Sequence, residues 1–184
     1  SKSAPDVDLR SWLATLEAHG ELRRIKAEVD WNEEIGAIAR VNLGLQGPGL
    51  LFENITGYRD KRCTKFLTGT LGNRRQVCLL LGLPLETTDR QLVAHLKRCY
   101  RQGIPPVEVA TGPVKTHVLY GSSLDLTQFP VPHWHHLDGG RYIDTFCGVI
   151  TRDPNTGRLN VGIYRGQLLG PDKVGKLLIP TQHW

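Results

Sequence analysis

The chain has 184 residues, which is enough for one complete domain or for a small domain joined to part of a second. Hydrophobic residues make up 40% and charged residues 22%, a balance that supports a packed core and excludes general disorder. The net charge of +5 favours anionic partners, and no apolar run approaches the roughly 20 residues of a membrane-spanning helix.

The first part of the chain predicts helices and short strands in alternation. Helical spacing is clearest at the start, where Leu9, Trp12, Leu13 and Leu16 recur on one face. In chain order, the predicted elements are a helix from Asp6 or Asp8 to Gly20, a strand over 22–29, a helix from Asp30 or Asn32 to Gly47, strands over 50–52 and 65–69, a helix over 72–82, and a helix capped by Thr87 or Thr88 that stops before Gly103.

The second part of the chain predicts strands and turns. Ile104–Pro105–Pro106 is the best linker, and the sequence pattern changes after it. Strands are expected over 114–120, 145–151 and 159–164, with a hairpin turn at 153–157 between the last two. We therefore predict an α/β fold in two domains. Residues 1–105 form an N-terminal α/β domain, and residues 106–184 form the opening strands of a β-barrel or mixed sheet.

Composition also bears on the compartment. The four cysteines match no CxxC spacing for a metal or redox site, so we expect reduced thiols. The stretch from Ser1 to Asp6 has no apolar core and does not resemble a secretory signal. Together these features predict a cytoplasmic protein with no membrane partner.

Two polar clusters have a simple structural interpretation. The basic residues between Arg59 and Arg75 lack interleaved aromatic residues and match no nucleic-acid-binding motif, so they favour a solvated surface. The cluster His133–Trp134–His135–His136 is flanked by prolines and by Gly139–Gly140, which predicts a loop. We expect these imidazoles to line a cleft mouth rather than to bind a metal ion.

The stretch Asn160–Val161–Gly162–Ile163–Tyr164–Arg165 combines an amide, a glycine and an arginine. Asn160 and Arg165 are five positions apart, so a regular strand directs them to opposite faces. A ligand shared by both must wrap the end of the strand, or Gly162 must host a bulge. The alternative is an ordinary hairpin with a surface arginine.

Five stretches in order resemble the UbiD decarboxylase family. Asn160-x-Gly162-Ile163-Tyr164-Arg165 resembles the family's cofactor motif, and Ile179-Pro180-x-Gln182-His183 resembles its second cofactor motif. The three other similar stretches are Asp138 to Ile143, Thr151 to Pro154, and Asp8 to Leu13 leading to Gly20–Glu21–Leu22. The resemblance extends over essentially the whole chain.

The resemblance implies prenylated FMN as the cofactor, in a domain that begins a flavin-binding split β-barrel. Its implied contacts are Asn160, Val161, Gly162, Ile163, Tyr164, Arg165, Gln182 and His183. Asn160 and His183 are implied ligands of a divalent metal, typically Mn²⁺, that bridges to the cofactor phosphate, with K⁺ nearby. Arg165 is implied as the catalytic residue, because a guanidinium holds a carboxylate through two hydrogen bonds.

The implied activity is the reversible, non-oxidative decarboxylation of an aromatic or α,β-unsaturated carboxylic acid. A separate prenyltransferase would supply the cofactor, and the full-length enzyme would be a homo-oligomer. The family's third metal ligand, its two further acidic residues and its dimerisation domain are expected beyond Trp184. We therefore expect an N-terminal part of the enzyme that is inactive by itself. The alternative is a catalytically incomplete flavin-binding or assembly subunit that acts with another chain.

Overall fold

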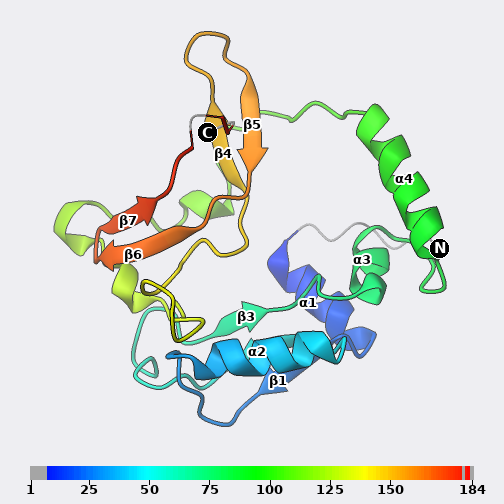
Figure 1. Ribbon diagram of the computed structural model, residues 1–184. Coiled ribbons are helices and arrows are strands. Elements are labelled where there is room, and N and C mark those ends of the chain that lie inside the picture. The colour runs from blue at the N-terminus through cyan, green and yellow to red at the C-terminus, as the bar shows by residue number, and fades with distance from the viewer. Residues whose placement is uncertain (1–7, 180, 183–184) are drawn as a thin grey trace. The chain divides into compact units, whose positions relative to one another are not determined.

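The computed structural model describes residues 8–179, 181 and 182 (Figure 1). The chain forms two compact units whose segments alternate along the sequence. The first unit contains the chain up to Ile25 together with Val41–Leu51 and Leu67–Tyr120; the second contains Lys26–Arg40, Phe52–Phe66 and the chain from Gly121 onward. Within the described residues, no helix is both long enough and apolar enough to cross a bilayer.

The helices of the first unit begin where capping residues predict. Helix α1 (Leu9–Ala18) begins after Asp8, whose side chain accepts a hydrogen bond of 2.8 Å from the Ser11 amide. Asn73 caps α3 (Arg74–Leu80) and Thr88 caps α4 (Asp89–Arg101), each in a reciprocal capping box. The predictions of Asp8 and Thr88 as caps are confirmed.

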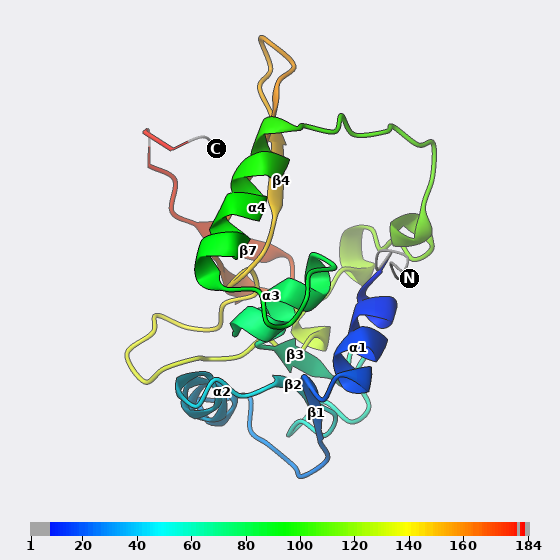
Figure 2. The same ribbon diagram turned by 90° about the vertical axis from the view of Figure 1, so that its right-hand side faces the viewer.

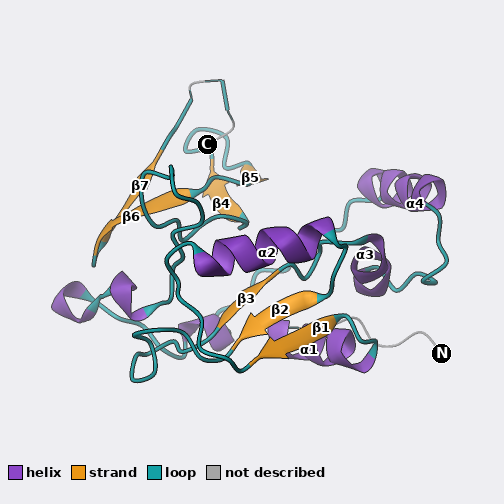
Figure 3. Cartoon of the chain, turned by 60° about the horizontal axis from the view of Figure 1, so that its bottom comes forward, coloured by secondary structure: helices purple, strands orange, loops and turns teal. Residues whose placement is uncertain are grey.

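A three-stranded sheet lies in the order β1 (Leu22–Ile25), β2 (Gly49–Phe52) and β3 (Phe66–Thr68). Every residue of the central strand β2 is buried, as expected for an apolar strand with neighbours on both edges. Helix α1 packs against β1 and α3, and it lies along one side of the sheet (Figure 3). The fully buried side chains Leu16 and Cys78 contribute to the core from these two helices.

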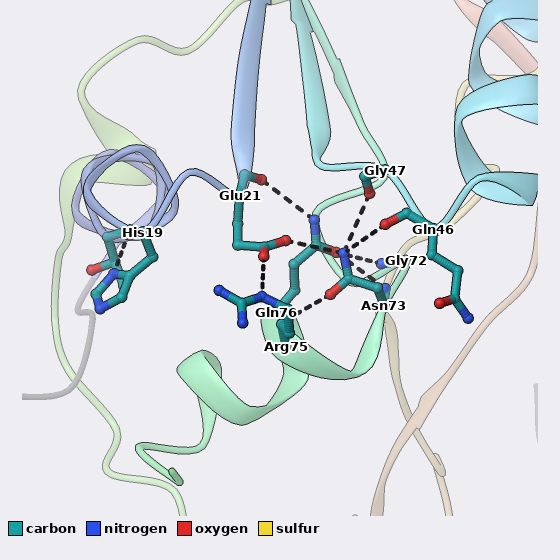
Figure 4. Close-up of polar contacts among 9 residues, drawn as sticks. His19, Glu21, Gln46, Gly47, Gly72, Asn73, Arg75 and Gln76 are labelled. Carbon is teal, nitrogen blue, oxygen red and sulfur yellow. Dashed lines mark hydrogen bonds and ion pairs between the residues drawn. The ribbon is translucent and has the colours of Figure 1, made fainter. Parts of the chain in front are cut away.

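A buried polar network joins the end of α1 to the start of α3 (Figure 4). The Glu21 carboxylate accepts hydrogen bonds from Arg75 Nε at 2.6 Å and from Asn73 Nδ2 at 3.0 Å. The backbone carbonyl of Glu21 accepts hydrogen bonds from the Gly49 amide at 2.9 Å and from Gln76 Nε2 at 3.4 Å. Glu21 is only 7% exposed, so these partners replace the water that its charge loses on folding.

Helix α4 differs from the other helices of its unit. It extends away from the sheet in two perpendicular views (Figures 1 and 2), and none of its residues is buried. Its apolar residues Val93 and Leu96 are exposed. Helix α4 ends at Arg101, and residues 103–109 form neither helix nor strand. The predicted domain division near residue 105 stays a prediction.

Helix α2 (Glu34–Gly44) follows a tight turn. Asp30 was one of two predicted caps, and its carboxylate accepts a hydrogen bond of 2.8 Å from the Asn32 amide. Glu33 adopts a left-handed backbone with φ of 66°, directly before the first helical residue. The residue that directly precedes the helix is therefore Glu33, and neither Asp30 nor Asn32 is its N-cap, because this turn separates them from the first helical residue.

The second unit contains two antiparallel hairpins, β4–β5 and β6–β7 (Figure 1). Strands β4 (Val149–Arg152) and β5 (Leu159–Gly162) are joined by the predicted turn, in which Asp153 accepts from the amides of Asn155 and Thr156 at 2.8 and 2.9 Å. Strands β6 (Gly166–Gly170) and β7 (Lys173–Lys176) form the second hairpin, which sequence analysis did not predict.

Several predicted strands are wrong or too long. The strand over 114–120 is absent, because Pro113 begins a 3₁₀ turn over Pro113–Lys115 and the exposed Val114 and Val118 lack a strand partner in the described chain. The strand over 22–29 ends at Ile25, and Val29 makes only an isolated bridge to Ile55. The strands over 145–151 and 159–164 shorten to β4 and β5. The mixed α/β class is confirmed, whereas the split β-barrel stays a prediction.

Candidate functional site

The predicted cofactor motif runs through the end of β5 into the link before β6. Asn160, Val161 and Gly162 belong to β5, and residues 163–165 lie between the two strands. Exposure nevertheless alternates along the whole stretch: Val161, Ile163 and Arg165 are exposed, while Asn160, Gly162 and Tyr164 are half-buried. The segment is therefore extended, and Asn160 and Arg165 lie on opposite faces, as their spacing predicts.

The Tyr164 ring lies against Gly162. A Cβ atom at Gly162 would lie 2.3 Å from Cε2 of Tyr164, far inside contact distance. The aromatic ring thus occupies the space that a side chain would fill on the half-buried face. Of the two ways in which Asn160 and Arg165 could share a ligand, a bulge at Gly162 is absent, since Val149 and Gly162 are paired in the regular β4–β5 register. The only shift in the two hairpins' registers lies between Leu168 and Gly170.

A hollow of about 370 Å³ lies beside Asn160. Asn160 is paired across the ladder with Thr151, so its position is set by the β4–β5 hairpin. Two arginines give the hollow positive charge, which suits an anionic group. Its lining consists of Thr151, Arg152, Asp153, Pro154, Arg158, Leu159 and Asn160.

The carboxylate of Asp153 in this lining is occupied by its own turn. The amides of Thr156 and Asn155 hold the pKa of Asp153 below its ordinary value, because these hydrogen bonds favour the ionised form. Asp153 therefore acts as a turn residue. Its negative charge offsets part of the charge of Arg152 and Arg158.

The opposite face of the motif is apolar and open. Val161 is 68% exposed and Ile163 is 62% exposed, although both are large hydrophobic residues in an ordered segment. Arg165 lies on the same face, with its guanidinium carbon 5.4 Å from the centre of the Tyr142 ring. Within the described chain, no carboxylate forms an ion pair with Arg165. This face combines apolar surface with a positive charge, as a site for a flat aromatic ligand and a carboxylate requires.

The backbone beneath Arg165 is held by a charged pair. Lys176 forms an ion pair with Asp144 and donates a hydrogen bond of 2.9 Å to the Tyr164 carbonyl. The thiol of Cys147 also approaches this carbonyl, at 3.6 Å. On the other side of Arg165, the Gly166 carbonyl accepts from the Ile143 amide at 2.9 Å.

The second predicted motif is described only in part. Gln182 is exposed, and its backbone N–H donates a hydrogen bond of 2.9 Å to the Ile179 carbonyl. His183 lies outside the described residues. The predicted metal pair of Asn160 and His183 therefore stays a prediction, as do the other predicted roles of the motif residues.

The histidine loop is held by contacts within its own unit. His133 has Nδ1 at 2.8 Å from Asn32 Oδ1 and Nε2 at 3.2 Å from the Asp138 carbonyl, so both ring nitrogens have partners. His136 Nδ1 lies 3.4 Å from Glu33 Oε1. In the part of the chain that the structure describes, no group of three or more His, Cys, Asp or Glu residues is arranged to hold a metal ion.

Sequence reasoning missed the residues that support Arg165, namely Tyr142, Asp144, Gly166 and Lys176. The missed hairpin explains most of this, because Lys176 is paired across it with Gly166. Gly170–Pro171–Asp172 lies where β6 meets β7. As a turn between two strands, it would have placed Lys176 near Gly166.

Comparisons with known proteins cover nearly the whole chain. Residues 13–96 match the N-terminal domain of 3-octaprenyl-4-hydroxybenzoate carboxy-lyase, UbiD, and residues 106–184 match its Rift-related domain. The phenolic acid decarboxylase of Bacillus subtilis is 35% identical over 183 residues, which are 96% of this chain and 38% of that protein.

Solved structures show the same similarity. The UbiD-class enzyme HmfF from Pelotomaculum thermopropionicum, in an evolved dimeric form in complex with prFMN, is 34% identical with a TM-score of 0.81, over 95% of this chain and 39% of that one. The vanillic acid decarboxylase of Sedimentibacter hydroxybenzoicus in its closed form is 31% identical with a TM-score of 0.85, over 96% and 38% of the two chains. This chain thus spans about two fifths of the length of these relatives. Because the two domain models match successive parts of the sequence, the chain belongs to the UbiD family.

Proposed function

We propose that this chain carries the cofactor-binding segment of a carboxy-lyase that uses prenylated FMN. The proposed reaction is the reversible, non-oxidative decarboxylation of an aromatic or α,β-unsaturated carboxylic acid. The observation that carries the proposal is the open face of Val161, Ile163 and Arg165. The hollow beside Asn160 lies on the other face of the same strand, so a cofactor that uses both must wrap the end of the strand. Two relatives named for phenolic acid and vanillic acid, and one bound to prFMN, support the substrate class and the cofactor.

The residues present fit such a cofactor. Exposed Val161 and Ile163 offer apolar surface to a ring system, and the charges of Arg152 and Arg158 suit a phosphate. The Asn160 amide is a hard oxygen donor on the wall of the same hollow, so we propose it as a ligand of Mn²⁺ together with His183. Gln182 is proposed to contact the flavin, and K⁺ is proposed nearby.

Arg165 is proposed to hold the substrate carboxylate. A guanidinium stays charged and offers two parallel N–H donors, which fix both oxygens of a carboxylate in one plane. The reaction breaks the bond between the carboxylate carbon and its neighbour, releases CO₂ and places a proton on that neighbouring carbon. When bound, prenylated FMN supplies the electron sink for this step. An acidic residue outside the described site would deliver the proton.

The test is expression of the natural gene together with a flavin prenyltransferase. We expect the purified protein to release CO₂ from at least one member of a panel of aromatic and cinnamic acids, and to exchange the corresponding product hydrogen for deuterium in D₂O. The same protein loaded with unmodified FMN is the matched control and should be inactive. A protein that retains the modified flavin yet processes no acid would favour the alternative of an incomplete flavin-binding or assembly subunit.

A second arm uses the 184-residue chain alone with prenylated FMN, Mn²⁺ and K⁺. We expect no turnover, because the family's proton donor and third metal ligand have no counterpart among the proposed site residues. Losing a catalytic acid costs roughly 100- to 10,000-fold in rate. Clear turnover would show that these residues contain the complete set of acids.

A further inference from the structure

We propose that Lys176 is a positioning residue for Arg165. It acts through the Tyr164 carbonyl, directly before the arginine, together with Asp144, and it lies opposite Gly166 in the hairpin. The inference rests on the proposed role of Arg165 in binding a carboxylate. It concerns side chains outside both predicted cofactor motifs, since the first motif ends at Arg165 and the second begins at Ile179.

The first step is the space above Gly166. Gly166 and Lys176 are opposite one another in the β6–β7 register, and Gly166 is buried. A Cβ atom at Gly166 would lie 2.4 Å from Val174 Cγ1, 2.9 Å from Asp144 Oδ2 and 3.2 Å from Lys176 Cε. Val174 occupies most of the volume that another residue at position 166 would need, and Asp144 and Lys176 close the rest of it.

The second step is the direction of the lysine head group. Lys176 Nζ reaches Asp144 and the Tyr164 carbonyl, so one ammonium joins a side chain and the main chain. The lysine side chain is only 18% exposed and that of Asp144 is 31% exposed. A partly buried charge with two defined acceptors holds a narrower geometry than a surface pair does.

The third step connects this contact to Arg165. The peptide group is planar, so fixing the Tyr164 carbonyl also fixes the direction of the Arg165 amide and the position of its Cα. The Ile143 amide fixes the next carbonyl, that of Gly166. Tyr142 belongs to the same segment as Ile143 and Asp144, and its ring lies beside the Arg165 guanidinium. Arg165 thus projects an exposed side chain from a backbone that is held before and after it.

The consequence is a pre-organised guanidinium. A misplacement of about 1 Å at a group that orients a substrate can cost roughly 100-fold in rate. Loss of the Lys176 contact removes the charged donor from the Tyr164 carbonyl and leaves the longer Cys147 thiol contact at 3.6 Å, so the Tyr164–Arg165 peptide is held less tightly. The loss should therefore weaken recognition of a carboxylate more than it weakens contact with the rest of the substrate.

The test measures binding without turnover. The full protein is loaded with unmodified FMN, and the dissociation constants of an aromatic acid and its primary amide are measured from flavin fluorescence. The acid is whichever member of the aromatic and cinnamic panel the wild-type protein binds most tightly. We expect Lys176→Met to weaken binding of the acid about tenfold or more and to leave binding of the amide within about twofold. Lys176→Arg should restore part of the difference, because it keeps a charged donor.

Three further variants make the result decisive. Asp144→Asn and Gly166→Ala should produce the same selective loss, the first by removing the ion pair and the second by displacing Val174 and the Asp144 carboxylate that pairs with Lys176. Lys173→Met is the matched control, since Lys173 is exposed on the same strand, and it should bind both ligands as wild type does. A loss of equal size for acid and amide in Lys176→Met and Asp144→Asn would show a merely structural role and overturn the inference.

Arg165→Ala separates this inference from the proposed function. If that variant binds the acid as tightly as wild type, or if wild type binds no acid of the panel, the proposed role of Arg165 fails. If Arg165→Ala loses the acid selectively while Lys176→Met does not, only the positioning role of Lys176 fails.

Discussion

The Glu21 network and the Asn160–Arg165 segment are both polar and both ordered, yet their polar groups face different surroundings. The two oxygens of the Glu21 carboxylate accept hydrogen bonds from Arg75 and Asn73, and the residue is almost fully buried. In the second region, Arg165 is exposed beside exposed Val161 and Ile163. One region completes its interactions internally, whereas the other presents charge and apolar surface outward.

The difference separates residues that stabilise the protein from residues available for a ligand. A buried carboxylate costs free energy unless protein groups replace its water, so the Glu21 network is explained by folding alone. Large apolar side chains left open beside an arginine contribute little to folding. Substitutions in the two regions should therefore have opposite effects on stability and on function.

The largest expected effect is on activity, at Arg165. Arg165→Ala should lower kcat/KM for decarboxylation by roughly 100-fold or more, because the substrate carboxylate loses a charged, two-pronged partner. Arg165→Lys should also fail, since an ammonium offers no planar pair of donors. The melting temperature should change little, because the side chain is exposed. Near-normal kcat/KM in the lysine variant would make Arg165 a surface residue and remove one side of the comparison.

The next effect is on cofactor retention, at Asn160. Asn160→Ala removes an amide oxygen from the wall of the hollow. We expect the affinity for prenylated FMN in the presence of Mn²⁺ to fall at least about tenfold. The measurement is flavin absorbance after gel filtration with and without Mn²⁺. Arg158→Ala is an informative companion, since it should weaken retention with and without Mn²⁺ alike. Unchanged occupancy in Asn160→Ala would argue against the proposed ligand.

The third effect is on stability, at Glu21. Glu21→Ala leaves the Asn73 amide and the Arg75 guanidinium without their carboxylate, which should lower the free energy of unfolding by about 1–3 kcal/mol. Arg75 is half exposed and can recover water, which keeps the cost below that of a fully buried pair. Chemical denaturation of the full protein measures the change.

Activity provides the control for Glu21. At a temperature where the variant remains folded, kcat/KM should stay within about twofold of wild type, because substitutions away from a site add independently. A selective loss of activity without a loss of stability would show that the network belongs to a functional site.

Local chemistry made much of the fold predictable from sequence. Asp8 and Thr88 were identified as helix caps because short polar side chains bind the amides of a first helical turn. The turn at Asp153–Gly157 was predictable for the same reason, since its aspartate accepts amides of its own loop. The opposed faces of Asn160 and Arg165 followed from strand periodicity.

Long-range packing was not predictable in the same way. The contact of Lys176 with Asp144 joins residues 32 positions apart, and no local pattern specifies it. The predicted strand over 114–120 was wrong because its valines have strand propensity but Pro113 turns the chain. The roles proposed for Asn160 and Arg165 come from the resemblance to UbiD, because exposure alone does not assign a role to either residue.

The smallest expected effect is the pH dependence of the hairpin that carries Asn160. Hydrogen bonds from the amides of Thr156 and Asn155 lower the pKa of Asp153 in the folded protein. Because the pKa is lowered in the folded protein, the stabilisation that ionised Asp153 gives the hairpin is fully present above the ordinary pKa of aspartate. This stabilisation is lost as the pH falls through the lowered value. NMR titration of the Thr156 amide should therefore show a single acidic transition, with its midpoint below that of aspartate in an unstructured peptide. Asp153→Asn keeps an acceptor but cannot titrate, so its Thr156 amide should show no such transition. A midpoint at or above the peptide value would mean that Asp153 is not held by its turn, and the wall of the hollow beside Asn160 would then be less ordered than the Glu21 network.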